Sequence, residues 1–158
     1  MEYNATEVRV ALDTVFTDLV RVETRLYNAV ADRLRVESGI GAGYFELLRY
    51  VRDHSDARVA DLAAAFAIGV GATSKIVDRV EKEGWLARRP NPANRRSSLL
   101  ALTAAGEAVV SRAEPAWQAA IEDLLGGSVT PGELKTLSRT LRALRSDLER
   151  RRLGLPTG

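Results

Sequence analysis

Residues 77–106 read VDRVEKEGWLARRPNPANRRSSLLALTAAG, and the fold assignment depends on the change of pattern within them. The stretch begins with apolar residues at helical spacing, and Gly84 then occupies a position where helices commonly end in a left-handed residue. Two short apolar runs follow, at 85–89 and 97–102, separated by the turn-forming residues 90–94. We therefore expect a helix that ends at Gly84 and is followed by a β-hairpin.

The rest of the chain shows mainly helical patterns. Two short helices joined by the glycine-containing turn 68–71 form a helix-turn-helix unit, and the hairpin after it forms a wing. The predicted fold class is mainly α: a six-helix winged helix-turn-helix with a two-stranded β wing and a helical dimerisation region. The expected helices cover residues 5–36, 42–54, 59–67, 70–83, 104–125 and 131–152.

The last expected helix carries leucines at alternating spacings of three and four, the period of a coiled-coil seam. These leucines are Leu134, Leu137, Leu141, Leu144 and Leu148. An ordinary core helix shows the same spacing, but the first helix is also long and apolar, and the winged lobe is too small to cover both. We predict a homodimer. Residues 1–36 and 104–152 are its expected dimerisation segments, 40–103 its DNA-binding lobe and 153–158 a tail.

The helix at 70–83 has the two faces that base reading in a major groove requires. One face is apolar, and the other begins with small residues and continues with polar and basic ones. A solvated amphipathic helix with no ligand has the same two faces. The candidate DNA-contacting residues on this helix are Gly71, Ala72, Ser74, Lys75 and Arg79.

Positive charge concentrates in this helix and the hairpin. Residues 70–98 hold seven basic and three acidic side chains, so seven minus three gives +4, whereas the whole chain carries +2. Such a cluster favours a polyanionic partner, and double-stranded DNA is the predicted one. The candidate phosphate-contacting residues of the hairpin are Arg88, Arg89 and Arg95. A helical protein-interaction dimer without DNA binding remains the alternative.

The stretch 77–106 resembles the MarR (multiple antibiotic resistance regulator) family of winged helix-turn-helix transcriptional regulators. The resemblance rests on the helix end at Gly84, the arginine-containing wing and the Leu102-Thr103-Ala-Ala-Gly106 entry to the next helix, and Leu62-Ala63 upstream agrees with it. It implies a ligand-responsive repressor that binds a pseudo-palindromic operator as a dimer.

The resemblance also assigns roles in the wing. Arg96 matches the arginine that enters the minor groove, and Asn94 falls where the family usually has an aspartate that braces this arginine. An asparagine can hydrogen-bond an arginine, but without charge assistance.

A small aromatic or phenolic effector is the second partner that the resemblance implies, bound where the dimerisation helices meet the winged lobe. Plain core packing is the alternative for each residue expected there. The candidate effector-binding residues are Phe16, Val20, Tyr44, Phe45, Leu48 and Trp117. The cations available for an acidic effector are Arg21, Arg49 and His54.

Several function classes lack support. Cysteine is absent and His54 is the only histidine, so neither thiolate nor Ser-His-Asp catalysis is expected, and His54 fits better as the end of a helix. No phosphate-binding glycine motif appears. We expect no enzyme, no cofactor, no metal and no membrane partner. The location expected from the absence of signal and membrane-spanning segments is cytoplasmic.

Overall fold

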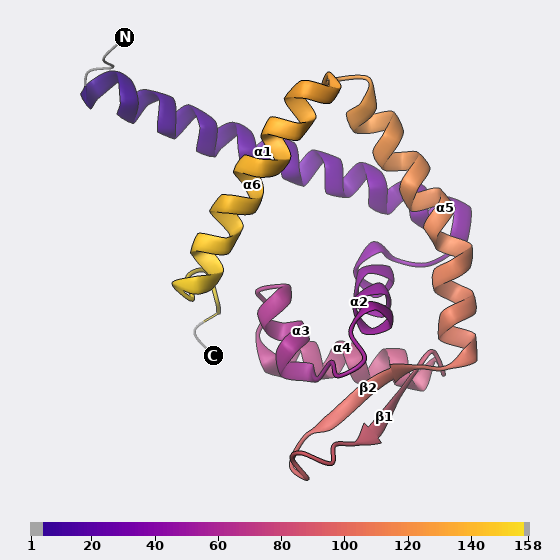
Figure 1. Ribbon diagram of the computed structural model, residues 1–158. Coiled ribbons are helices and arrows are strands. Elements are labelled where there is room, and N and C mark those ends of the chain that lie inside the picture. The colour runs from indigo at the N-terminus through magenta and orange to yellow at the C-terminus, as the bar shows by residue number, and fades with distance from the viewer. Residues whose placement is uncertain (1–4, 157–158) are drawn as a thin grey trace.

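The computed structural model describes residues 5–156, and within them it has six helices and one two-stranded antiparallel sheet (Figure 1). The elements are α1 (Ala5–Ser38), α2 (Ala42–Asp53), α3 (Val59–Ala65), α4 (Val70–Lys82), β1 (Leu86–Pro90), β2 (Ser98–Leu102), α5 (Ala104–Gly126) and α6 (Pro131–Arg150). This arrangement confirms the predicted fold class. The segments predicted at 1–36 and 153–158 lie partly outside the described residues.

The core lies where α2, α3, α4 and the hairpin meet the C-terminal end of α1 and the first half of α5. Phe45, Leu48, Leu62, Val77 and Leu100 are fully buried or nearly so, which confirms the inward faces expected for α2, α3 and α4. Burial of these side chains removes apolar surface from water and fixes the short helices in place. The lobe built around this core therefore presents α4 and the hairpin on a packed support.

The turn between α3 and α4 lies at 66–69, two residues before the glycine-containing turn expected at 68–71, while α4 begins at Val70 as expected. The left-handed residue is Ala67, with φ 50°, and the amide of Ile68 donates to the carbonyl of Ala63 at 3.0 Å. Local composition pointed to the glycines, whereas the hydrogen bonds that end α3 decide which residue turns.

The hairpin is confirmed, with Leu86 opposite Leu102 and Pro90 opposite Ser98. Gly84 has φ +78°, as expected for the residue after α4. The amide of Leu100 donates to the carbonyl of Ala57 at 2.8 Å, which ties β2 to the segment between α2 and α3. The wing is thus attached to the lobe along one strand.

The Leu102–Gly106 entry has a steric explanation. Thr103 caps α5, since its hydroxyl accepts from the amide of Gly106 at 3.1 Å and donates to the carbonyl of Gly84 at 2.6 Å. These contacts press the first turn of α5 onto Trp85. A Cβ at position 106 would lie 1.9 Å from the carbonyl oxygen of Trp85, so only glycine fits.

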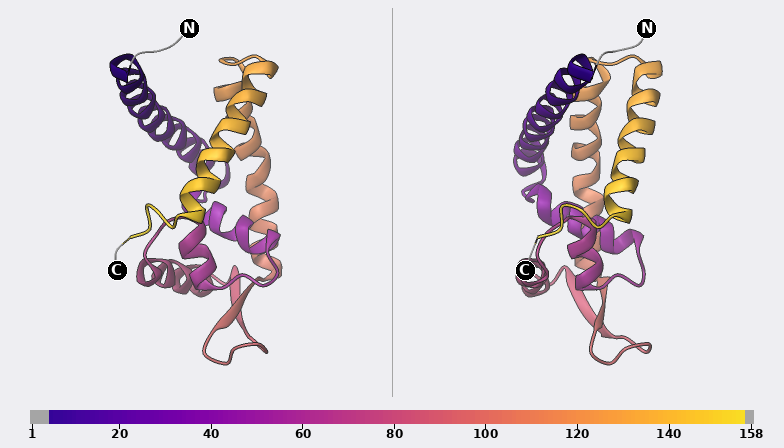
Figure 2. Two further views of the ribbon diagram at one scale, coloured as in Figure 1. Left: turned by 60° about the vertical axis from the view of Figure 1, so that its left-hand side comes forward. Right: turned by 90° about the vertical axis from the view of Figure 1, so that its left-hand side faces the viewer.

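Figure 2 shows α1, the second half of α5 and α6 on the opposite side of the lobe from the hairpin. The last part of α1 packs along α5 and buries Leu34. The N-terminal half of α1 keeps its apolar face exposed, and Phe16 has 67 % of its surface in solvent. None of the residues of α6 is buried, and its five seam leucines are between 39 and 50 % exposed. The predicted apolar faces exist, but this chain does not cover them.

Helix ends follow the sequence signals. Thr130 and Glu133 form a capping box at the start of α6, and α5 continues through Pro115, with a bend part-way along it in Figure 1. Among residues 5–156, no single helix is long and apolar enough to cross a membrane. Helices α3 and α4 reach that length and apolarity only together, across a bend of 116°.

Candidate nucleic-acid interface

Helix α4 is held by one face and leaves the other open. Thr73, Val77 and Val80 are buried, and the Thr73 hydroxyl donates to the carbonyl of Gly69 at 3.0 Å. Four of the five positions predicted to contact DNA are exposed, and Ser74 is half-buried at the edge of the open face. The four exposed positions are Gly71, Ala72, Lys75 and Arg79. Small residues in the first turn leave room for a close approach by a groove floor.

The tip of the wing is organised by two asparagines. Asn91 is only 8 % exposed, its side-chain oxygen accepts from the backbone amide of Ala93 at 3.0 Å, and its side-chain nitrogen donates to the Ser97 hydroxyl at 2.9 Å. The Asn94 side-chain oxygen accepts from the backbone amide of Arg96 at 3.0 Å. Asn94 therefore holds the backbone of Arg96 in a turn, a role that composition alone did not indicate.

Arg88 is the hairpin arginine that faces α4. Its Nη2 donates to the carboxylate of Asp78 at 2.6 Å, and its Nη1 pairs with the carboxylate of Glu81. Its backbone amide also donates to Glu81, at 3.2 Å. The arginine side chain is only 28 % exposed. Of the predicted phosphate-contacting residues, Arg88 is thus engaged within the protein.

The other cations of α4 and the hairpin form no ion pair within the part of the chain that the structure describes. They are Lys75, Arg79, Lys82, Arg89, Arg95 and Arg96, and all six are exposed. Both elements lie at the same end of the molecule, away from α6 (Figure 1). Six cations that lack protein partners on adjoining elements form a surface suited to a polyanion.

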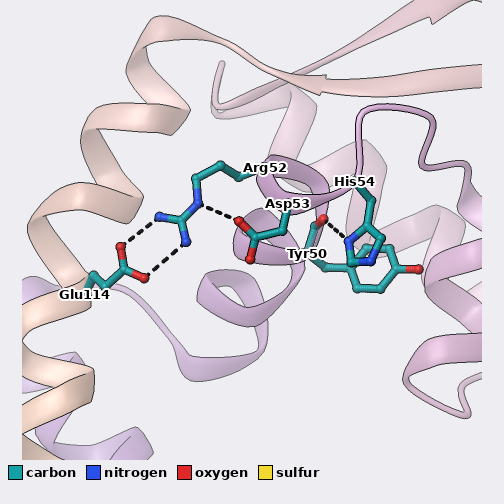
Figure 3. A network of polar contacts seen from close by, with 5 residues as sticks. All are labelled: Tyr50, Arg52, Asp53, His54 and Glu114. Carbon is teal, nitrogen blue, oxygen red and sulfur yellow. Dashed lines mark hydrogen bonds and ion pairs between the residues drawn. The ribbon is translucent and has the colours of Figure 1, made fainter.

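A polar network fastens the lobe to α5 (Figure 3). Arg52 donates to both oxygens of Glu114, at 2.7 and 3.1 Å, and to Asp53 at 3.0 Å. The hydrogen bonds from Arg52 lower the pKa of Glu114 below its ordinary value. His54 ends α2 as predicted, with Nδ1 2.8 Å from the Tyr50 carbonyl and its ring stacked on Tyr50 at 3.9 Å.

The residues predicted to bind an effector are not brought to one surface. Phe45 and Leu48 are fully buried, and Trp117 packs against Phe45 with ring centroids 5.1 Å apart. Tyr44 is half-buried, while Phe16 and Val20 lie on the exposed part of α1. Of the three candidate cations, Arg49 lies over the rings of two predicted effector residues, 4.9 Å from the ring of Trp117 and 5.3 Å from that of Phe45.

Sequence reasoning missed a cavity of about 670 Å³ between α3 and the end of α6. Its walls include Tyr50, Ala64, Leu148 and Leu153, and none of the six predicted effector residues lines it. Its existence depends on how α6 returns toward the lobe, which no local pattern encodes. Among the described residues, no group of three or more His, Cys, Asp or Glu side chains is placed to hold a metal.

Comparison with known proteins relates this winged lobe to the MarR family. The model of the MarR family matches residues 42–98, from the start of α2 into β2. The multiple antibiotic resistance protein MarR of Escherichia coli is 27 % identical over 103 residues, which cover 65 % of this chain and 72 % of that protein. The winged lobe of this chain thus matches the MarR family, which confirms the family resemblance expected from residues 77–106.

Solved MarR-family structures have the same fold. Sco3205, a MarR-family transcriptional regulator from Streptomyces coelicolor in complex with DNA, superimposes with a TM-score of 0.78 at 25 % identity, covering 94 % of this chain and 91 % of that one. Bordetella bronchiseptica BpsR, whose DNA binding is regulated by 6-hydroxynicotinic acid, gives 0.73 at 24 % identity, covering 84 % of this chain and 98 % of that one. The wing of the present chain forms a hairpin although Asn94 stands where the resemblance implies an aspartate.

Proposed function

We propose that this protein is a dimeric, sequence-specific DNA-binding repressor that responds to a small ligand. The observation that carries the proposal is the set of six unpaired, exposed cations on α4 and the wing. The DNA-bound state of Sco3205 supports it. In the proposal, α4 enters a major groove and the wing lies over the adjacent minor groove.

Dimerisation supplies the symmetry of the operator. Residues 1–36 and 104–152 form the subunit contact in this proposal, and 40–103 form the DNA-binding lobe. Two α4 helices then read half-sites about 10 base pairs apart, one turn of the double helix. A dimer across a promoter represses by blocking polymerase.

The proposal is tested first by a mobility-shift assay with random duplex DNA at low salt. We expect binding that weakens steeply as salt rises, because cations displace counterions from phosphates. An absence of binding to any duplex would favour the alternative, a helical protein-interaction dimer.

The second test separates base reading from backbone contact. Duplexes selected from a random library by the wild-type protein serve as operators. Ser74→Ala and Lys75→Ala should each change the preferred base at particular positions, at a cost of about 1–3 kcal/mol there. If both variants weaken all sequences equally, these side chains touch only phosphates and the assignment of the reading face is wrong.

The effector is the less constrained part of the proposal. Phe45 and Leu48 have no exposed surface in this conformation, so a ligand there requires the lobe to move relative to α1. The cavity between α3 and α6 is already open and within the usual size of ligand sites. Titration with aromatic carboxylates should release DNA if an effector favours a different separation of the two α4 helices.

A further inference from the structure

The contacts of Arg88 set it apart from the other arginines of the wing. Its two terminal nitrogens are taken up by Asp78 and Glu81, while Arg89 beside it is exposed and has no ion pair within residues 5–156. A guanidinium has five N–H donors in a fixed fork, and one that faces two carboxylates has little left for a phosphate. The geometry is that of an internal brace.

The two carboxylates occupy a defined flank of α4. Asp78 and Glu81 are three residues apart, so they lie on one side of the helix, the side turned toward β1. The predicted base-reading face of the same helix carries Lys75 and Arg79. Without Arg88, two negative charges would stand unpaired next to the phosphate backbone of a bound duplex.

We propose that Arg88 is a positioning residue, which locks the wing to α4 and neutralises Asp78 and Glu81 at the edge of the reading face. This inference rests on the proposed function for its effect on DNA. It replaces the sequence-based expectation that Arg88 contacts phosphate. In this proposal the ion pairs of Arg88 with Asp78 and Glu81 set the distance between α4 and the wing.

The first experiment measures the brace without DNA. Hydrogen exchange of the hairpin amides is compared for wild type, Arg88→Met and the neighbouring control Arg89→Met. Methionine keeps an unbranched stem and removes the charge. We expect exchange in 86–90 and 98–102 to quicken about tenfold in Arg88→Met alone, because the hairpin opens locally more often. Unchanged exchange in Arg88→Met would overturn the proposal.

The second experiment is a double-mutant cycle on a selected operator duplex. Arg88→Met is introduced into wild type and into Asp78→Asn/Glu81→Gln. In wild type we expect a loss of about tenfold in affinity, since both carboxylates become unpaired and the wing is released. In the Asp78→Asn/Glu81→Gln background we expect affinity to fall about twofold or less, because Arg88 has no carboxylate to pair with there.

A phosphate contact predicts a different cycle. Arg88→Met would then lose as much affinity in the Asp78→Asn/Glu81→Gln background as in wild type, or more, and the log–log salt slope would flatten by about 0.9 in both. That result would overturn the proposal. If wild type binds no duplex, the proposed function fails, while the exchange experiment still decides whether the brace exists.

Discussion

The guanidinium of Arg52 on α2 and the carboxylate of Glu114 on α5 form a two-point contact across 62 residues of sequence, with N–O distances of 2.7 and 3.1 Å. The side chains are 27 and 34 % exposed. Bidentate pairs fix angle as well as distance. This pair therefore orients the lobe on the helix that leads to the dimerisation region.

Removing one partner of this pair should destabilise the fold. For Glu114→Gln we expect a loss of about 1 kcal/mol in the free energy of unfolding at pH 7, below the range for buried charged hydrogen bonds because water screens the pair. Urea denaturation measures the loss. Glu122→Gln is the matched control, since Glu122 lies on the exposed side of α5 and should change the free energy by no more than about 0.5 kcal/mol.

The same pair predicts a dependence on pH. The Arg52 hydrogen bonds lower the pKa of Glu114 in the folded protein below its ordinary value of 4.5. The pair therefore contributes fully to folding stability above pH 4.5, and this contribution is lost as the pH falls through the lowered folded pKa. The stability difference between wild type and Glu114→Gln should accordingly stay constant from pH 7 to about 5.5 and shrink in more acid solution. A difference that persists unchanged to pH 3 would contradict the link between the two residues.

Gly106→Ala tests the contact between α5 and Trp85. The added methyl group would lie 1.9 Å from a backbone carbonyl, so either α5 or the hairpin must move. We expect at least about 3 kcal/mol of destabilisation by thermal or urea unfolding. Gly132→Ala in the first turn of α6 meets no atom within 4 Å and should be neutral or slightly stabilising. Equal stability of the two variants would show that the contact is not obligatory.

Local patterns predicted the elements because each pattern is decided within a few residues. The helix end at Gly84 and the hairpin turn at 90–94 needed no distant partner, and the structure has both. Side-chain partners are decided by packing. The sequence shows the charge of Arg88 but not that Asp78 and Glu81 lie opposite it, so Arg88 was grouped with the arginines expected to contact phosphate.

The apolar pattern of a helix also does not identify what the helix packs against. The apolar periodicity of α1 predicted a face that a packing partner covers, and within this chain Phe16 is exposed while Leu34, on the same helix, is buried. The difference lies in what each half of α1 packs against, since α5 covers only the C-terminal half. An apolar face therefore indicates that something covers it, without identifying the cover.

The exposed seam of α6 predicts a subunit contact. Leu137→Asp/Leu141→Asp should give monomeric or unfolded protein, because two charges would enter the face that is proposed to pack against a second copy. Ala143→Asp/Ser146→Asp adds the same two charges on exposed positions away from the seam and should remain dimeric. Sedimentation at micromolar concentration distinguishes the two results. A folded wild-type monomer would end the dimer proposal.

The last prediction concerns the wing tip, where the backbone amide of Arg96 donates to Asn94 and its guanidinium has no ion-pair partner within the described residues. A free guanidinium on an ordered backbone suits a narrow minor groove, where A·T-rich sequence makes the potential most negative. Arg96→Ala should therefore lose preference for A·T-rich flanks as well as affinity. Arg89→Ala should mainly lose affinity and about 0.9 of salt slope, the signature of one phosphate contact.

Asn94→Asp separates the two ways in which this position can act on Arg96. An aspartate can still accept from the Arg96 amide, with charge assistance, so the turn should be at least as well ordered. If order of the turn is what directs Arg96 into the groove, flank discrimination should rise, while the added negative charge lowers non-specific affinity. If aspartate instead captures the guanidinium, flank discrimination should fall toward that of Arg96→Ala. Salt titrations of wild type and both variants, on one operator with A·T-rich and with G·C-rich flanks, distinguish these results. We expect the first, because the 3.0 Å hydrogen bond from the Arg96 amide already turns the side chain at position 94 toward the backbone of the turn.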